Sequence, residues 1–147
     1  MVKVMGIDFE GKTACFVVVA KAGDDTNVVF KERAELAETR SRDDMVLFRD
    51  AVRRIMKDAA PDRISIRGKL ENGQMRAGAA ALKMEAIILA ESTVDVAFVS
   101  SVKAKKQPDA DGLFGYLQPA FRAAMAGLAD GDQPPKNKKS SRSKSKS

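Results

Sequence analysis

The chain contains no histidine, a single cysteine and no long apolar run. Without histidine, imidazole can serve neither as a general base nor as a metal ligand. One cysteine, Cys15, excludes an internal disulfide and every zinc site built from paired cysteines. Cys15 lies within an apolar run, where a thiol is usually a small buried hydrophobic group, and we assign it no function. Any chemistry must therefore use carboxylates, amines, hydroxyl groups or the backbone.

Membrane and export signals are also missing from the sequence. No stretch approaches the roughly 18 consecutive apolar residues that a membrane span requires. The N-terminus lacks the basic region, apolar core and cleavage site of a secretory signal. With 147 residues, 44% apolar and 31% charged, the chain suits one globular domain. We expect a cytoplasmic protein with no membrane partner.

Charge is distributed unevenly along the chain. The formal net charge is +6, from 26 Lys and Arg against 20 Asp and Glu. Six of the cations lie in the last twelve residues, which contain no acid: Lys136, Lys138, Lys139, Arg142, Lys144 and Lys146. Residues 1–135 therefore carry 20 charges of each sign. A neutral body weakens the case for general nucleic-acid binding by the domain, although it is compatible with a local basic patch.

The C-terminal segment differs in composition from the rest. From Asp130 onward, Gly, Pro, Lys and Ser replace every aliphatic residue, so little apolar surface is available to offset chain entropy. We expect a folded domain over residues 1–129 and a disordered, basic Ser/Lys tail over 130–147. Six cations on phosphates would lower affinity roughly a thousandfold between about 50 and 200 mM salt. Nucleic-acid binding by the tail would thus be weak, salt-sensitive and indifferent to sequence; a role in solubility is the alternative.

The first third of the chain predicts strands. Residues 2–9 and 13–20 are β-branched and aromatic runs separated by a turn over 10–12, which is typical of an antiparallel hairpin of interior strands. Residues 23–27 predict a second turn. Residues 28–36 then alternate between apolar and charged side chains, which indicates a half-exposed strand at a sheet edge.

Helices and short strands alternate in the remainder. Ser41 and Asp44 form a weak capping box, and an apolar stripe at spacings of three and four predicts a helix over 42–59, ended by Pro61. Residues 63–67 and 94–99 predict strands, and 79–91 a helix that is apolar nearly all round and hence mostly buried. Phe114, Leu117, Phe121, Met125 and Leu128 predict a last amphipathic helix, which Pro119 would split or kink.

This order of elements, βββαβαβα, predicts an α/β protein with a five-stranded mixed sheet. Three antiparallel strands would be followed by parallel strands, with helices on both faces and right-handed crossovers. The ribonuclease H-like fold has the same order of elements.

Asp8 interrupts the apolar first strand near its end. Burying an unpaired carboxylate costs several kcal/mol, so this side chain must reach solvent or have a partner. Two interpretations are open: Asp8 is a metal ligand, or it is a carboxylate at the strand's end that backbone amides or an arginine bind.

Gly6, Ile7 and Asp8 resemble the first-strand motif of the Holliday-junction resolvases of the RuvC and YqgF kind. The chain as a whole, from residue 1 to about 128, resembles more closely a small bacterial family of unknown function placed with those resolvases. The matching stretches are Gly6 to Asp8 with Gly11, Ile64 to Arg67, Gly73 to Gly78, Leu82 to Ala86, and Ala110 to Leu113.

The resemblance implies a site and a cofactor. In such nucleases, acids on the first strand, after the fourth strand and on the last helix hold two divalent cations, which activate water and stabilise the leaving oxygen. Magnesium or manganese is implied here, with Asp8 and Asp111 as metal ligands and catalytic residues. Asp109 and Asp111 could instead simply cap the last helix.

The resemblance fails at one catalytic position. Where the family has an acid at the end of the fourth strand, this chain has Arg67, Gly68 and Lys69, and the nearest carboxylate is Glu71. Glu71 is the candidate replacement as third catalytic acid. Lys69 and Arg76 belong to a glycine-bearing loop whose backbone could approach a phosphate; a flexible, solvated connection is the alternative.

These observations favour a resolvase-related protein that binds structured nucleic acid and has an incomplete set of catalytic acids. Two alternatives stay open: an active metal-dependent nuclease that hydrolyses phosphodiesters, and a protein-interaction scaffold with no nucleic-acid role. A homodimer is compatible with the sequence.

Overall fold

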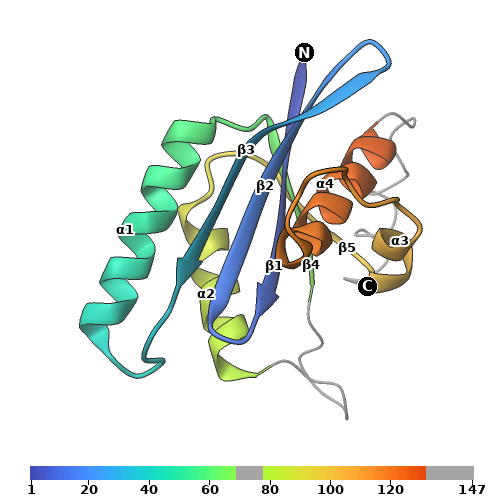
Figure 1. Cartoon of the computed structure of the whole chain (residues 1–147). Helices are drawn as coiled ribbons and strands as arrows, with labels where there is room; N and C mark the ends of the chain where they lie inside the picture. The colour runs from blue at the N-terminus through green and yellow to red at the C-terminus, as the bar shows by residue number, and fades with distance from the viewer. Residues whose placement is uncertain (69–77, 132–147) are drawn as a thin grey trace, which may run out of the picture.

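The computed structural model describes residues 1–68 and 78–131 and has the predicted α/β fold. One sheet contains five strands in the order β3-β2-β1-β4-β5 (Figure 1). The strands are β1 (Val2–Glu10), β2 (Thr13–Ala22), β3 (Asp25–Glu35), β4 (Arg63–Arg67) and β5 (Val96–Val99). The helices are α1 (Arg42–Ala59), α2 (Ala79–Glu91), α3 (Ser101–Lys105) and α4 (Gln118–Gly131), with a short 3₁₀ helix η1 (Gly115–Leu117) before α4.

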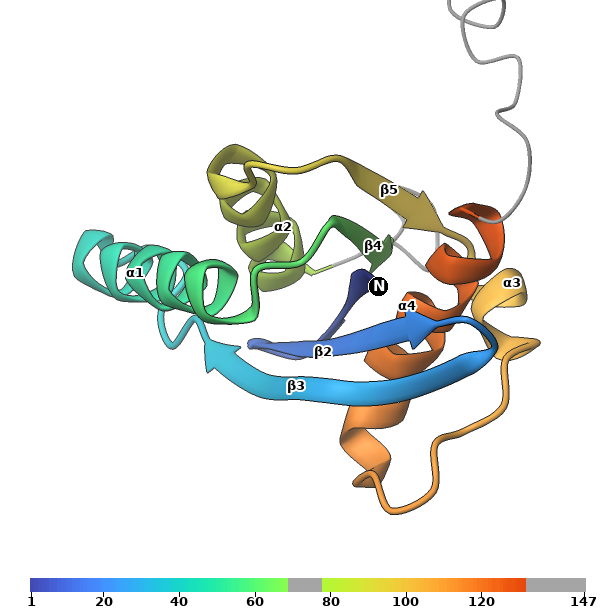
Figure 2. The same cartoon turned by 90° about the horizontal axis from the view of Figure 1, so that it is seen from above.

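Helices cover both faces of the sheet. Figure 2 shows α1 and α2 on one side and α4 on the other. The central strand β1 pairs with β2 in antiparallel and with β4 in parallel orientation. Its side chains alternate between the faces, so that Met5, Ile7 and Phe9 pack toward α1 and α2 while Val4, Gly6 and Asp8 face α4. Burial on both sides explains why residues 4–9 of β1 are apolar apart from Asp8.

The boundaries of α1 follow its capping residues. The Ser41 hydroxyl accepts a hydrogen bond of 3.1 Å from the Asp44 amide, as the capping box predicts. Phe48, Val52 and Ile55 are buried against the sheet. The helix ends at Ala59. Ala60 follows with a left-handed φ of 46°, and Pro61 comes next.

Small residues let α4 lie directly on the sheet. A Cβ added at Gly6 would collide with the carbonyl oxygen of Ala120 and lie 2.5 Å from the amide nitrogen of Ala124. Further along the helix, a Cβ at Gly127 would lie 2.7 Å from Ser65 on β4. The distance between the α4 backbone and the sheet is therefore fixed by these contacts, which also positions the segment before α4.

The predicted edge strand is confirmed, with an earlier start. β3 lies at the sheet edge and begins at Asp25, so the turn before it is shorter than predicted and uses Gly23 at φ +63°. The register shifts between Val18 and Val19, which leaves Val29 as an extra residue in β3. This bulge bends the strand, and the extra residue, Val29, is half-exposed and points away from the core.

Two details of the helix predictions were wrong. α2 has the predicted bounds but is not mostly buried, since Leu89 is 42% exposed and Ala86 and Ala90 are also exposed. Only its inner side rests on the core, through Ala81, Met84 and Ile88. The apolar composition on all sides of the helix therefore did not predict how much of its surface is buried.

Phe114 lies outside the last helix and is 64% exposed, whereas Leu117, Phe121 and Leu128 are buried as predicted. The predicted helix is divided into the 3₁₀ helix η1 and the α-helix α4, which begins at Gln118. Pro119 is the second residue of α4, where its missing N–H needs no partner. The short helix α3 was not predicted. None of the helices described is long and apolar enough to cross a bilayer.

Candidate functional site

One row of side chains crosses the sheet on the face covered by α4. Register pairs Arg33 of β3 with Cys15 of β2, and Cys15 with Asp8 of β1. Arg67 of β4 is next in line, since Ile66 is the partner of Ile7. The row lies near the carboxyl ends of β1 and β4. It places a carboxylate and a thiol between two arginines.

Asp8 and Arg67 form the centre of this row. Asp8 is only 4% exposed. Arg67 Nε lies 3.1 Å from Asp8 Oδ1, and the arginine side chain is 22% exposed. This is the arginine-bound arrangement of Asp8 that the sequence left open beside metal ligation. Because a guanidinium keeps its charge at all accessible pH values, the carboxylate always faces a cation here.

Cys15 is a buried, free thiol. Burial and, to a smaller extent, the neighbouring Asp8 carboxylate raise its pKa to about 11, while Arg33 acts in the opposite direction. At neutral pH the thiol keeps its proton. It is therefore neither an activated nucleophile nor a thiolate ligand, as its place in an apolar run suggested.

Asp111 lies on a different part of the protein from Asp8. Together with Gly112 and Leu113 it lines a pocket of about 350 Å³ against residues 28–31 of β3. Since β2 stands between β3 and β1, the structure does not place Asp111 beside Asp8. The carboxylate of Asp109 pairs with Arg122 of α4.

Gln118, which sequence reasoning missed, holds the segment that contains Asp111. This side chain is buried, and its Oε1 accepts a hydrogen bond of 2.8 Å from the Ala110 amide. Its Nε2 donates to the carbonyl oxygens of Ala110 and Leu113 at 2.8 and 2.9 Å. Gly112 completes the turn at φ +78°. The stretch from Ala110 to Leu113, one of the matching motifs, thus has a structural explanation.

Two aromatic rings lie beside Arg33, at the β3 end of the row. Phe114 and Tyr116 are stacked, with ring centroids 5.7 Å apart and planes inclined by 12°. The guanidinium carbon of Arg33 lies 4.2 Å from the centroid of the Tyr116 ring. The helical pattern of the sequence had assigned Phe114 to the core, and no local signal distinguished it from the apolar residues around it.

Several predicted residues lie outside the part of the chain that the structure describes. Glu71, Lys69 and Arg76 fall between residues 69 and 77, and the six tail cations fall after residue 131. Their roles stay predictions: Glu71 as a catalytic acid, and the cations Lys69, Arg76, Lys136, Lys138, Lys139, Arg142, Lys144 and Lys146 as contacts to nucleic acid.

The described residues do not fit the magnesium or manganese site that the fold implies. Within 1–68 and 78–131, no three residues of the types His, Cys, Asp and Glu converge as a metal site would require. Magnesium prefers several oxygen ligands, commonly carboxylates. Beside Asp8 the register instead places a protonated thiol and a guanidinium. We therefore derive no reaction step through a metal ion.

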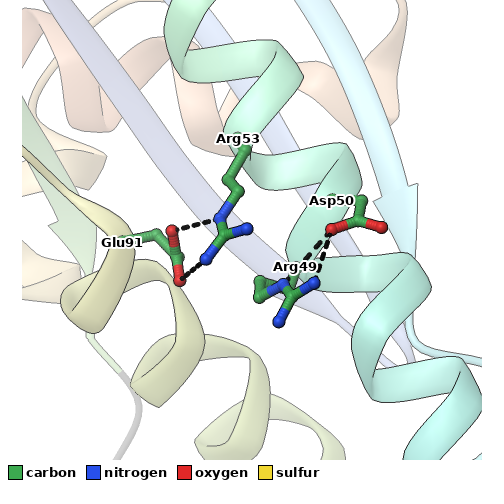
Figure 3. Close-up of polar contacts among 4 residues, drawn as sticks. All are labelled: Arg49, Asp50, Arg53 and Glu91. Atoms are coloured by element: carbon green, nitrogen blue, oxygen red, sulfur yellow. Dashed lines mark hydrogen bonds and ion pairs between the residues drawn. The ribbon is translucent and has the colours of Figure 1, made fainter.

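On the face of the sheet covered by α1 and α2, arginines are paired with carboxylates. Arg53 of α1 donates two hydrogen bonds to Glu91 of α2, at 2.7 and 3.2 Å, and Arg49 is bonded to Asp50 (Figure 3). The hydrogen bond from Arg53 lowers the pKa of Glu91. By contrast, no carboxylate in the described part of the chain pairs with Arg33. Arg33 on the α4 face is therefore one cation that is open to a ligand.

The fold is that of the RuvC-like resolvases. Thermus thermophilus RuvC superposes with a TM-score of 0.70 at 13% identity, over 86% of this chain and 93% of that chain. The same protein in complex with a Holliday junction substrate gives 0.68 at 14% identity, over 90% and 97%. Fowlpox virus resolvase with Holliday junction DNA gives 0.55 at 9% identity, over 90% and 100%. At such identities the likeness concerns the fold alone.

Residues 2–127 match the family described as protein of unknown function DUF3010, and the chain belongs to that family. No curated protein matches the sequence significantly. The predicted resemblance to a small family with a resolvase-like fold is thereby confirmed.

Proposed function

We propose that this protein binds structured nucleic acid with the α4 face of its sheet and does not hydrolyse it by two-metal chemistry at Asp8. The observation that carries the proposal is the Asp8–Arg67 ion pair, which puts a cation beside the first-strand carboxylate. Support for the ligand class comes from the fold, since RuvC and the fowlpox virus resolvase were solved with Holliday junctions.

Arg67 and Arg33 are the phosphate contacts in this proposal. They occupy β4 and β3 with β1 and β2 between them, so their backbones are roughly 14 Å apart at about 4.8 Å per strand. A guanidinium has five N–H donors, and the single ion-pair contact to Asp8 leaves Arg67 others for a phosphate. Asp8 is thus a positioning residue that orients Arg67.

A binding measurement on the full chain tests this role. Arg67→Gln is expected to weaken binding to a labelled four-way junction by roughly tenfold and to reduce the slope of affinity against salt by about one. Arg54→Gln is the matched control, because Arg54 lies on α1 beside Glu32, away from the α4 face. Equal effects of the two substitutions would contradict the proposal, as would no binding to junction, duplex or single strand at low salt, which would favour the scaffold alternative.

Cleavage must be assayed in the same samples with magnesium and with manganese. We expect none. Metal-dependent cleavage of the junction that Asp8→Asn abolishes would establish the active nuclease and overturn the proposal.

The tail is expected to add affinity without selectivity. Deletion of residues 136–147 removes six cations, so the salt slope should flatten by about five while the preference for junction over duplex is kept. Loss of that preference would show that the folded domain does not select the structure.

A further inference from the structure

The segment before α4 presents its aromatic side chains to solvent. Along residues 113–117, Leu117 is buried and Leu113 packs against the core, while Phe114 and Tyr116 between them are exposed. Tyr116 is the only tyrosine and the chain has no tryptophan. Phe9, Phe16 and Phe48 are fully buried, whereas Phe98 of β5 is exposed like Phe114. Phe114 differs from Phe98 in that its ring is stacked on a second exposed aromatic ring.

The two rings are held in a fixed arrangement. The Leu117 amide donates to the Phe114 carbonyl at 3.0 Å, and Gln118 donates to the Leu113 carbonyl just before it. The rings are stacked on each other, and Arg33 lies over Tyr116. The order of the backbone on both sides reduces the entropy that a ligand would have to remove on binding.

We infer that Phe114 and Tyr116, with Arg33, form a stacking site for an unpaired nucleobase of the bound nucleic acid. The inference rests on the proposed function and names the part of the ligand that this surface takes. An exposed aromatic face stacks on any base, because every base has a π-face. Arg33 supplies a cation at the same place for the adjoining phosphate.

Charge and shape favour an unpaired base over a duplex. In a duplex the base faces cover one another, whereas single strands and strand-exchange points offer free faces. Asp111 is an exposed acid on the N-terminal side of the rings, so a phosphate is disfavoured there and favoured toward Arg33. A pair of stacked rings beside one cation fits one base better than an extended helix.

Substitutions at Phe114 test the stacking site in the full chain. Phe114→Leu keeps an apolar side chain but removes the π-face, and is expected to weaken binding to a labelled single-stranded oligonucleotide by roughly tenfold. Phe114→Trp keeps the face and introduces the only tryptophan, whose fluorescence should be quenched as the oligonucleotide binds. Leu47→Ala is the control, since Leu47 is an equally exposed apolar residue on α1.

The outcomes separate this site from the wider function. Wild-type affinity in Phe114→Leu, or unchanged fluorescence of Phe114→Trp at saturation, overturns the stacking site even if junction binding still depends on Arg67. Absence of any nucleic-acid binding by the wild-type chain overturns both proposals. A loss confined to single strands, with duplex binding kept, supports the stacking site.

Discussion

The two faces of the sheet bury different chemistry. Against α1 and α2 the buried residues form one continuous apolar cluster. The buried polar residues of the described chain are Asp8, Ser65 and Gln118, and all three belong to the face covered by α4. Asp8 faces Arg67, Ser65 lies under Gly127, and Gln118 holds a loop. One face therefore contributes mainly to stability, while the other also fixes specific positions.

The apolar face should show the larger response to loss of volume. Phe48→Ala is expected to lower the free energy of unfolding by about 4 kcal/mol, because it leaves a cavity in the packed cluster. Leu47 directly precedes Phe48 but is 66% exposed, so Leu47→Ala should change the free energy of unfolding by less than about 0.5 kcal/mol. Denaturant titration measures both values. A similar cost for the two variants would mean that α1 does not pack as described.

The α4 face should instead be sensitive to added volume. Gly6→Ala is expected to destabilise the protein by about 3 kcal/mol, since its methyl group meets the backbone of α4 rather than a side chain that can move. Gly115→Ala is the matched control, because nothing lies within 4 Å of a Cβ there. If thermal unfolding gave the same midpoint for both variants, the close approach of α4 would be disproved.

The Asp8–Arg67 pair tests whether the polar groups of the α4 face are coupled. Arg67→Ala is expected to cost about 2 kcal/mol, less than for a fully buried pair because the arginine is partly exposed. Asp8→Asn in the same chain should recover part of that loss, so that the double variant is more stable than the two single effects predict. Strict additivity of the two substitutions would show that the side chains do not interact.

The smallest effect concerns Cys15 and pH. Its folded pKa of about 11 is above the ordinary value of 9.0, so the folded state keeps a proton that the unfolded state releases. This stabilisation is complete below pH 9, has fallen by about 1 kcal/mol near pH 10, and is lost as the pH rises through 11. The stability of Cys15→Ala should decline less steeply over the same pH range. Comparing it with the wild-type chain cancels the contribution of other groups that titrate there. Parallel curves would contradict the assignment.

Most of the fold could be predicted because its signals are local. The hydroxyl of Ser41, the apolar stripe of α1 and the stop at Pro61 gave the bounds of that helix, and β-branched runs gave the hairpin. The partial exposure of α2 could not be predicted in this way, because exposure depends on which neighbours cover a helix. Periodicity likewise assigned Phe114 to a helical stripe that begins only after it.

The candidate site was less accessible from the sequence. Asp8 was identified as a residue that needs a partner, and an arginine was one of the partners considered. That Arg67 is the arginine depends on β4 pairing with β1 in one register, which is tertiary information. The same holds for Arg33 and Tyr116, which are far apart in the chain. Asp111 followed from a resemblance, and the motif it belongs to is explained by Gln118.

The extra residue in β3 has a consequence for self-association. A long strand with one unpaired side invites other chains to extend the sheet, with aggregation as the result. At Val29 the free edge is bent, and Lys31, Glu32 and Arg33 place alternating charges along the half that follows. Sheet extension by a second copy is therefore disfavoured along this edge.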